Sequence, residues 1–515
     1  MKRRHGYAKF IIRSVDQMNS VLGVDLGTSA VKVLLVAKDG TVRDEASVSY
    51  PIYHDSPGYS EQDPDDWVNA SKEAIKTVMD RLPEGDTVEG ISFSGQMHGL
   101  VLLDNEHRPI RRAILWNDTR TTAECREIEA NVGLDRLHAI TKNPALEGFT
   151  LPKLMWVKKH EPSHFKEAAV FVLPKDYVRL QLTGELHMDY SDAAGTLLLD
   201  VAKKEWSTEM AEKNGIPLSL LPPLIASHGQ TGTVTEQTAK ETGLPVTCRV
   251  FAGGADNACG AIGSGILEEG VTLCSTGTSG VVLSYEASGD KDFAGSVHYF
   301  NHGAPDVFYT MGVTLAAGYS LSWYKDTFSP DTPFGALIEE AVSSPAGAKG
   351  LLFTPYIVGE RTPHPDSEIR GTFTGIQASH TRGDFTRAVI EGITFSLNET
   401  VETFREKGKV ISKIISIGGG AKSALWLQIQ ADIFDAEVVT LKSEQGPGMG
   451  AAMLAAYGVG WFENLKDCAA VFVDEQDHYQ PVAENRALYR DLFTQYQQVY
   501  GATKAINHSL KPFRA

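Results

Sequence analysis

A short turn sequence that occurs twice, each time between two runs of β-prone residues, limits most strongly how this chain can fold. The string Gly-Thr-Ser stands at 27–29 inside the β-rich segment 21–36, and again at 277–279 inside the β-rich segment 271–284. Two β-rich runs joined by a tight polar tip predict a β-hairpin. Because the copies lie so far apart in the chain, they favour two similar domains over a solenoid of short repeats.

The size and charge of the chain fit a multidomain globular protein. Its 515 residues predict about two to four domains, and 42% hydrophobic residues is an ordinary globular content. No apolar run approaches the roughly 18 residues that a membrane helix needs, so we expect no membrane partner. The net charge of −17 argues against nucleic acid as a partner, because nucleic-acid binders present a basic surface.

The cysteines and the N-terminus both favour a cytoplasmic protein. The five cysteines are an odd number without a Cys-x-x-Cys pair, which predicts buried thiols rather than disulfides or a zinc site. Residues 1–17 are basic, but their apolar run is confined to 10–12 and is too short for a secretory signal. We expect 1–17 to be a loose extension or a segment ahead of a functional start at Met18.

Strand patterns alternate with helix patterns over most of the chain, which predicts layered α/β domains. We expect an N-terminal domain over 18–264 and a C-terminal domain over 265–505. The segment 284–349 shows no regular pattern, and we expect irregular structure there. The expected strands are 90–94, 250–254, 411–417 and 437–441, and the expected helices are 66–81, 385–407, 423–434 and 450–458.

Clusters of glycine and polar residues follow the expected strands, where α/β folds bind their ligands. Glycine lets backbone N–H groups approach a phosphate, while Ser, Thr and Lys side chains add donors and charge. Several such loops around one cleft would suit a nucleoside triphosphate. In the first hairpin the candidates are Gly27, Thr28, Ser29 and Lys32. The clusters stand at 25–29, 94–99, 253–257, 275–278 and 418–422.

Two common nucleotide-binding patterns fit the chain poorly. A full Walker A string is absent from the sequence, and 420–423 matches only half of one, so a P-loop fold is not predicted. The glycine-rich string at 446–450 follows a strand and opens a helix, but it misses the spacing of dinucleotide-binding folds. The sequence therefore predicts a nucleotide site of another kind.

Asp25 lies on the first expected hairpin, shortly before Gly27, and Asp256 follows the double glycine 253–254 at the end of an expected strand. Phosphoryl transfer needs positioned phosphates, a metal ion and a base for the nucleophile. One of these carboxylates would hold Mg²⁺ and the other would accept the proton of an attacking hydroxyl. The alternative interpretation is that either Asp simply caps a turn.

Two other polar clusters are candidates for reading sugar hydroxyls. A glutamine and a histidine lie beside glycines in 96–99, and an aromatic, an amide and charged residues are adjacent in 116–120. Structural interpretations remain open. A lone histidine is more often structural than ligand-binding, and a tryptophan buried in the core is at least as common as one that contacts a sugar. We expect the aromatic residues of 149–156 to lie in the core.

Several strings together resemble the FGGY carbohydrate kinases over 20–510. Gly-Phe-Thr-Leu-Pro-Lys-Leu-Met-Trp-Val at 148–157 is similar to the first family signature, and 371–376 followed by 384–391 is similar to the second. The strings at 94–99, 115–120, 190–193 and 359–364 are also similar to members of this family. The resemblance implies two actin-like and ribonuclease-H-like domains with a nucleotide cleft between them, in agreement with the duplicated hairpin.

The resemblance also implies roles for individual residues. Asp256 would be the general base, and Asp25 would act near Mg²⁺ and the γ-phosphate. Where glycerol kinases often carry Asn after the triple glycine, this chain has Ser423-Ala424, so no adenine contact is carried over there. The implied sugar neighbours are Gln96, Met97, His98, Trp116, Asp118 and Asn257. The implied nucleotide-binding residues are Gly277, Thr278, Gly318, Gly419, Gly420 and Lys422.

The activity implied by the resemblance is ATP-dependent phosphorylation of D-xylulose at O5, with Mg²⁺ as cofactor. Family analogy also implies a homodimer. Another ketose or polyol, such as ribulose, fuculose, gluconate or glycerol, is the nearest alternative substrate. A different class, an actin-like ATPase, would share the hairpins but would not need the cluster at 96–98.

Overall fold

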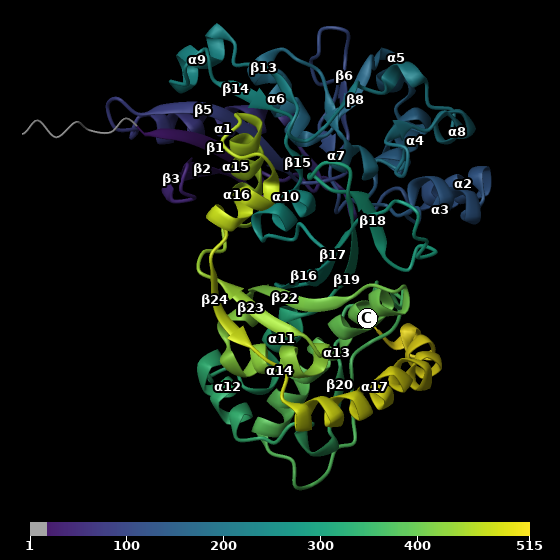
Figure 1. The fold of residues 1–515 in the computed structure, drawn as a ribbon. Coiled ribbons are helices and arrows are strands. Elements are labelled where there is room, and N and C mark those ends of the chain that lie inside the picture. Colours follow the sequence, from purple (N-terminus) through teal and green to yellow (C-terminus); the bar gives the residue numbers. More distant parts are fainter. Residues whose placement is uncertain (1–17, 515) are drawn as a thin grey trace, which may run out of the picture.

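The structure, a computed structural model, describes residues 18–514, which contain two halves each built around a seven-stranded mixed sheet (Figure 1). In the first sheet, the antiparallel hairpin of β1 (Asn19–Leu26) and β2 (Ala30–Ala37) lies beside the parallel strand β5 (Thr87–Gly95). The other strands of this sheet are β3 (Val42–Ser49), β13 (Gln230–Thr233), β14 (Arg249–Phe251) and the short β15 (Gly254–Ala255).

The second sheet repeats this arrangement. Its antiparallel hairpin, β16 (Gly270–Thr276) and β17 (Gly280–Glu286), lies beside the parallel strand β22 (Ile411–Gly418). The shared order confirms the predicted α/β class and the duplicated hairpin. The remaining strands of this sheet are β18 (His298–Asn301), β19 (Phe308–Thr314), β23 (Glu437–Leu441) and β24 (Glu475–Tyr479).

Helices cover both sheets, and their ends follow local capping rules. α1 (Pro64–Met79) begins with Pro64 in its first turn after the N-cap Asp63, and its apolar side packs against β2 and β3. α13 (Arg382–Glu406) begins at a capping box formed by Thr381 and Asp384. The other helices of eight or more residues are α2 (Thr122–Val132), α3 (Leu134–Thr141), α4 (Thr150–His160), α6 (Pro174–Thr183), α10 (Asp256–Gly263), α11 (Gly318–Phe328), α12 (Phe334–Val342), α14 (Ala424–Phe434), α15 (Gly446–Gly458), α16 (Leu465–Phe472) and α17 (Ala483–Ser509).

Shorter helices and strands lie between these elements. The short helices are α5 (Pro162–Glu167), α7 (Tyr190–Ala194), α8 (Thr208–Lys213) and α9 (Glu236–Thr242). The short strands outside the two large sheets are β4 (Glu61–Gln62), β6 (Val101–Leu103), β7 (Ala113–Ile114), β8 (Val170–Val172), β9 (Met188–Asp189), β10 (Leu199–Asp200), β11 (Glu205–Trp206), β12 (Leu224–Ile225), β20 (Leu352–Thr354) and β21 (Thr372–Thr374).

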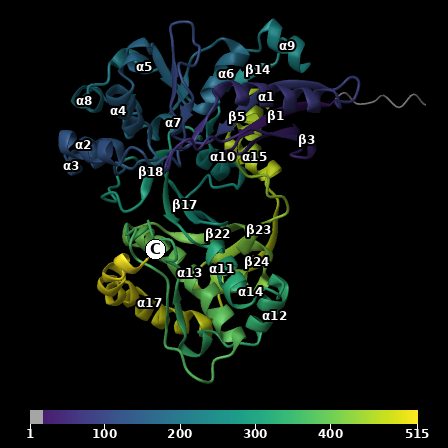
Figure 2. The ribbon, with the colours of Figure 1, turned by 180° about the vertical axis from the view of Figure 1, so that it is seen from behind.

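Helices α15 and α16 come from the second half of the chain but lie with the first sheet (Figures 1 and 2). α15 packs against β1, β5 and α10, and its backbone comes into direct contact with the backbones of β1 and α10. A Cβ atom at Gly23 would lie 2.1 Å from the Gly448 carbonyl oxygen, and one at Gly450 would lie 1.8 Å from that of Cys259. Only glycine at these positions allows so close an approach. The two halves are thereby joined by more than one crossing of the chain.

Most predicted elements are confirmed, and two differ. The segment 284–349, expected to be irregular, contains β18, β19, α11 and α12. All four residues of β18 are buried, so the strand lacks the alternation that a half-exposed strand shows. α15 begins at Gly446 rather than at 450. Its first turn contains a proline, which favours a helix start, but the glycines around it made this turn look unlike a helix in the sequence.

The remaining sequence predictions concern the thiols and the ends of the chain. All five cysteines are buried and unpaired, as predicted. Among residues 18–514, no helix is long and apolar enough to cross a membrane. The extension predicted over 1–17 lies outside the described residues.

Candidate active site

The two candidate catalytic carboxylates stand at the same edge of the first sheet. β1, β5 and β15 run parallel, and their register places Asp25 opposite Ser94 and Ser94 opposite Gly254. Asp256 follows two residues after Gly254, as the first residue of α10. Because neighbouring strands lie about 4.8 Å apart, this register brings both carboxylates to one site.

Asp256 is hydrogen-bonded by its neighbour, and its pKa is raised. Its Oδ1 accepts hydrogen bonds from the backbone N–H of Asn257 at 2.7 Å and from the Asn257 side-chain amide at 3.2 Å. Burial raises the pKa of Asp256 to about 7, and the negative charge of Asp25 contributes to the increase. A carboxylate with such a pKa exchanges protons readily near neutral pH.

Asp25 is the second carboxylate at this edge of the sheet. Burial raises its pKa, while Ser94 and Lys32 oppose the increase. The Lys32 ammonium is itself engaged, since it lies 3.0 Å from Glu45 Oε2 and donates to Gln445 Oε1 at 2.7 Å. One protein carboxylate is enough for Mg²⁺, which keeps several waters and takes phosphate oxygens of a substrate as further ligands. The residues present therefore fit Mg²⁺.

A cavity of about 520 Å³ opens at Asp256. Of the six predicted sugar neighbours, Gln96 does not line it, because its side chain is buried and donates to Gln62 Oε1 at 2.9 Å. Asp118 lines the cavity, but its carboxylate is held by Arg120 at 2.6 Å and by the Ser60 backbone N–H at 2.7 Å. The predicted residues that line the cavity are Met97, His98, Trp116, Asp118 and Asn257, together with Asp256.

His98 presents a fixed, neutral imidazole to this cavity. Its backbone has the left-handed φ of 68°, and its Nδ1 lies 2.7 Å from the Gly195 carbonyl oxygen. A carbonyl only accepts hydrogen bonds, so Nδ1 carries the proton and Nε2 is left as an acceptor. Burial, with a contribution from Lys153, lowers the pKa of His98 to about 3. An acceptor of this kind suits a sugar hydroxyl that donates.

Sequence reasoning missed much of the far wall of this cavity. Phe149, which we expected in the core, is buried but lines the cavity. His298 and Phe300 reach it from β18, the strand that showed no pattern. Arg361 also lines it and adds a positive charge. Arg361 falls within the string 359–364, so the resemblance carried a usable signal for it.

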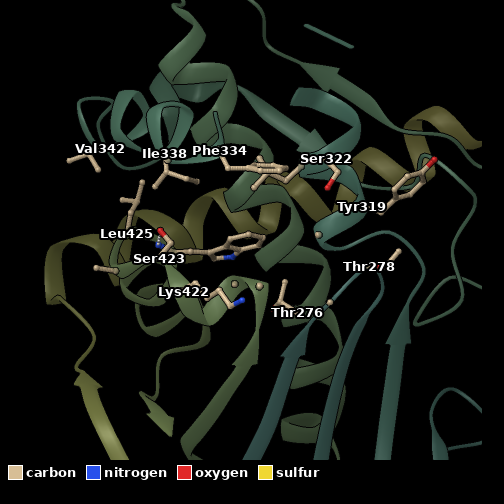
Figure 3. Close-up of a pocket in the computed structure, with 18 residues that line it drawn as sticks. Thr276, Thr278, Tyr319, Ser322, Phe334, Ile338, Val342, Lys422, Ser423 and Leu425 are labelled. Atoms are coloured by element: carbon tan, nitrogen blue, oxygen red, sulfur yellow. Dashed lines mark hydrogen bonds between the residues drawn. The ribbon is translucent and has the colours of Figure 1, made fainter. Parts of the chain in front are cut away.

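A second pocket, of about 670 Å³, lies on the second half and is drawn in Figure 3. It is formed by the tip of the β16–β17 hairpin, the start of α11, α12 and the loop before α14. The close contacts need glycine, since a Cβ atom at Gly318 would lie 2.5 Å from the Gly277 carbonyl oxygen. The structure brings together here six predicted residues: Gly277, Thr278, Gly318, Gly419, Gly420 and Lys422.

One side of the second pocket is apolar and was not predicted. Phe334 and Ile338 of α12 lie across the pocket from Lys422 and Thr276 (Figure 3). Glycines and a lysine suit phosphates, whereas an apolar wall suits a planar base. Helix α12 lies in the segment that showed no regular pattern, so its role was not visible in the sequence. The pocket is also lined by the apolar side chains of Val342, Leu425 and Trp426.

The predicted phosphate-binding residues of the first hairpin line neither pocket. Thr28 Oγ1 accepts a hydrogen bond from Trp116 Nε1 at 3.0 Å, which joins the hairpin tip to the first cavity. The Gly27 carbonyl oxygen accepts from the Tyr50 hydroxyl. Ser29 is exposed, and Lys32 has the partners given above. The structure therefore places the tip of the first hairpin beside the candidate sugar cavity.

The fold and the two pockets together define a two-domain α/β phosphotransferase, with acid residues on one half and a nucleotide-like pocket on the other. The chain belongs to the FGGY family of carbohydrate kinases. The profile of the family's N-terminal domain matches residues 20–263, and that of its C-terminal domain matches residues 272–459. As an FGGY kinase, it uses ATP as a substrate.

Similar proteins include kinases of known name. The chain is 55% identical to the xylulose kinase of Bacillus subtilis over 96% of its own length and 100% of that protein. A crystal structure described as a "xyloylose kinase" from Brucella ovis has 34% identity and a TM-score of 0.89, covering 95% of this chain and 100% of that one. The xylulose kinase structure from Rhodospirillum rubrum has 29% identity and a TM-score of 0.90, covering 95% and 100%.

Proposed function

We propose that this protein is a xylulose kinase that transfers the γ-phosphoryl group of ATP to O5 of D-xylulose. The observation that carries the proposal is the Asp256 carboxylate, which lies in a sugar-sized cavity and whose pKa is raised to about 7. The high identity to a xylulose kinase over almost the full length of both chains supports this choice of substrate.

In the proposed reaction, Asp256 accepts the proton of the terminal hydroxyl while that oxygen attacks the γ-phosphorus. The bond from the γ-phosphorus to the bridging oxygen breaks, and ADP leaves. The hydrogen bonds from Asn257 fix the orientation of the carboxylate. His98 Nε2 accepts a hydrogen bond from another hydroxyl and so orients the sugar.

The second pocket holds the nucleotide in this proposal. The Gly419 backbone N–H and the Lys422 ammonium face the phosphates, and the apolar wall of α12 packs against the base. Asp25 is the residue that would hold Mg²⁺. When bound, Mg²⁺ neutralises charge on the phosphate oxygens.

A substrate panel tests the proposal. ADP release is followed in a coupled assay with Mg-ATP and D-xylulose, ribulose, fructose, glycerol or no sugar. The proposal predicts rapid release with D-xylulose alone. Preference for another polyol would keep the mechanism but change the substrate. Release that does not depend on sugar would instead favour an actin-like ATPase.

The quaternary structure and the domain bounds belong to the same proposal. We infer a homodimer from family analogy, which analytical ultracentrifugation tests directly. We also propose that the domains, defined by their order along the chain, are residues 18–264 and 265–505. Helix α15 belongs to the second segment in this division but lies against the first sheet, and α16 packs on α15 and α10.

A further inference from the structure

A buried ionic cluster lies behind the candidate base, outside both pockets. The Lys175 ammonium lies 2.7 Å from Asp176 Oδ1, 2.7 Å from Asp189 Oδ1 and 2.9 Å from Asp192 Oδ2. All four side chains are fully buried. Because an ammonium already occupies the centre of the three carboxylates, we do not interpret them as a metal site. Removing so many charged side chains from water costs free energy, so we looked for a function of the cluster.

Hydrogen bonds connect Asp189 of the cluster, through Ser191, to Ala255, the residue that precedes the base. Asp189 Oδ2 accepts hydrogen bonds from the Ser191 backbone N–H at 2.8 Å and from the Ser191 hydroxyl. The Ser191 hydroxyl oxygen in turn accepts from the Ala255 backbone N–H at 2.9 Å. Ala255 is the N-cap of α10, and Asp256 is the first residue of that helix. The hydroxyl can donate in only one direction, so Asp189 fixes its lone pairs toward Ala255.

Other contacts hold the rest of this loop. The Arg179 guanidinium, which lies 2.8 Å from Asp176 Oδ1, also donates to the Ala252 carbonyl oxygen at 2.8 Å. The Gly253 backbone N–H donates to the Ser227 carbonyl oxygen at 2.9 Å. The pairing of β15 with β5 holds Gly254 and Ala255 from the sheet side. The Ser191 hydroxyl adds a side-chain contact to Ala255, the residue directly before the base.

The packing around Ser191 leaves little room for a different loop position. A Cβ atom at Gly254 would lie 3.1 Å from Ser191 Oγ and 3.2 Å from Cys259 Sγ. A general base must lie within about 2.6–3.2 Å of the proton donor, and a displacement of about 1 Å costs up to about 100-fold in rate. A single hydrogen bond that fixes the backbone beside Asp256 therefore affects the rate of the reaction.

We propose that Ser191 is a positioning residue for the general base: held by Asp189, its hydroxyl fixes the Ala255 backbone and thereby the place of the Asp256 carboxylate. This inference rests on the proposed function, because it assigns Asp256 the role of base. Ser191 does not line either pocket, so it acts only through Ala255.

The chain provides a matched control for the test. The Ser227 hydroxyl donates to the same Asp189 oxygen at 2.9 Å, but no hydrogen bond joins it to the loop that carries Asp256 within the described residues. Ser191→Ala and Ser227→Ala therefore each remove one hydrogen bond to Asp189. Only Ser191→Ala also removes the acceptor of the Ala255 N–H.

The kinetics of both variants are measured with D-xylulose and Mg-ATP, together with the melting temperature and the pH dependence of kcat/KM. Ser191→Ala is expected to lower kcat by about 10- to 100-fold, with KM for D-xylulose changed less than about threefold. Its acid limb is expected to shift to lower pH, because a displaced Asp256 is less buried. Ser227→Ala is expected to keep kcat within about twofold of the wild type.

Two results would overturn the proposal: a wild-type kcat in Ser191→Ala, or equal losses in both variants. If Ser191→Ala does not fold, Ser191→Cys is measured instead, since it keeps a side chain of similar size with a poorer acceptor. An unchanged kcat in that variant would also overturn it. Wild-type turnover in the same assay tests the proposed function alone, so the two failures are distinguishable.

Discussion

At the scale of single residues, the raised pKa of Asp256 makes a prediction about pH. The base works when deprotonated, so kcat/KM is expected to fall as the pH drops below about 7, the value to which burial raises this pKa. The same shift bears on stability. A raised carboxyl pKa stabilises the fold in the protonated state, and this contribution is lost as the pH rises through about 7. A pH–rate profile checks the first effect; an acid limb near the ordinary Asp pKa would contradict it.

Also at the residue scale, the neutral imidazole of His98 is expected to bind the sugar through Nε2. His98→Phe keeps an aromatic ring but removes both nitrogens. Since a neutral hydrogen bond contributes about 0.5–1.5 kcal/mol, KM for D-xylulose is expected to rise about 3- to 10-fold while KM for ATP stays constant. Steady-state kinetics with each substrate varied in turn would check this. Equal increases in both KM values would indicate a structural effect.

At the scale of secondary-structure elements, the close packing of α15 on α10 makes Gly450 essential. Gly450→Ala is expected to lower the free energy of unfolding by about 1–3 kcal/mol or more, because its Cβ atom would lie 1.8 Å from the Cys259 carbonyl oxygen. Gly501→Ala is the control: Gly501 lies within α17 with no atom within 4 Å of the added Cβ. That change is expected to stabilise the protein by up to about 1 kcal/mol. Thermal unfolding compares the two, and a Gly450→Ala protein as stable as the wild type would refute the packing argument.

The elements also show how far the sequence could lead. The two hairpins, α13 and the strand that precedes Asp256 follow from local patterns, so they were predictable. The residues of β18 were not, because a strand buried on both faces has no alternation. The partners of Lys175 come from separate segments of the chain, and a single sequence does not show which charges meet. Arg361 was visible only through the family resemblance.

At the scale of the whole molecule, the candidate base and the nucleotide pocket belong to different halves. Reacting atoms must approach to about 3–3.5 Å, so the halves are expected to close on the substrates. We predict that D-xylulose with a non-hydrolysable ATP analogue raises the melting temperature by more than the sum of the two separate increases. Differential scanning fluorimetry measures this. Strictly additive increases would argue against closure.

The measurement that tests the central claim most directly is a single turnover of D-xylulose with excess enzyme and Mg-ATP at pH 7.5, comparing the wild type with Asp256→Asn. Asn keeps the size of the side chain but does not accept the proton. We predict that the variant binds D-xylulose with a Kd within about threefold of the wild type and forms phosphorylated sugar at least about 100-fold more slowly. Near-normal turnover by the variant would contradict the assignment of Asp256 as the general base.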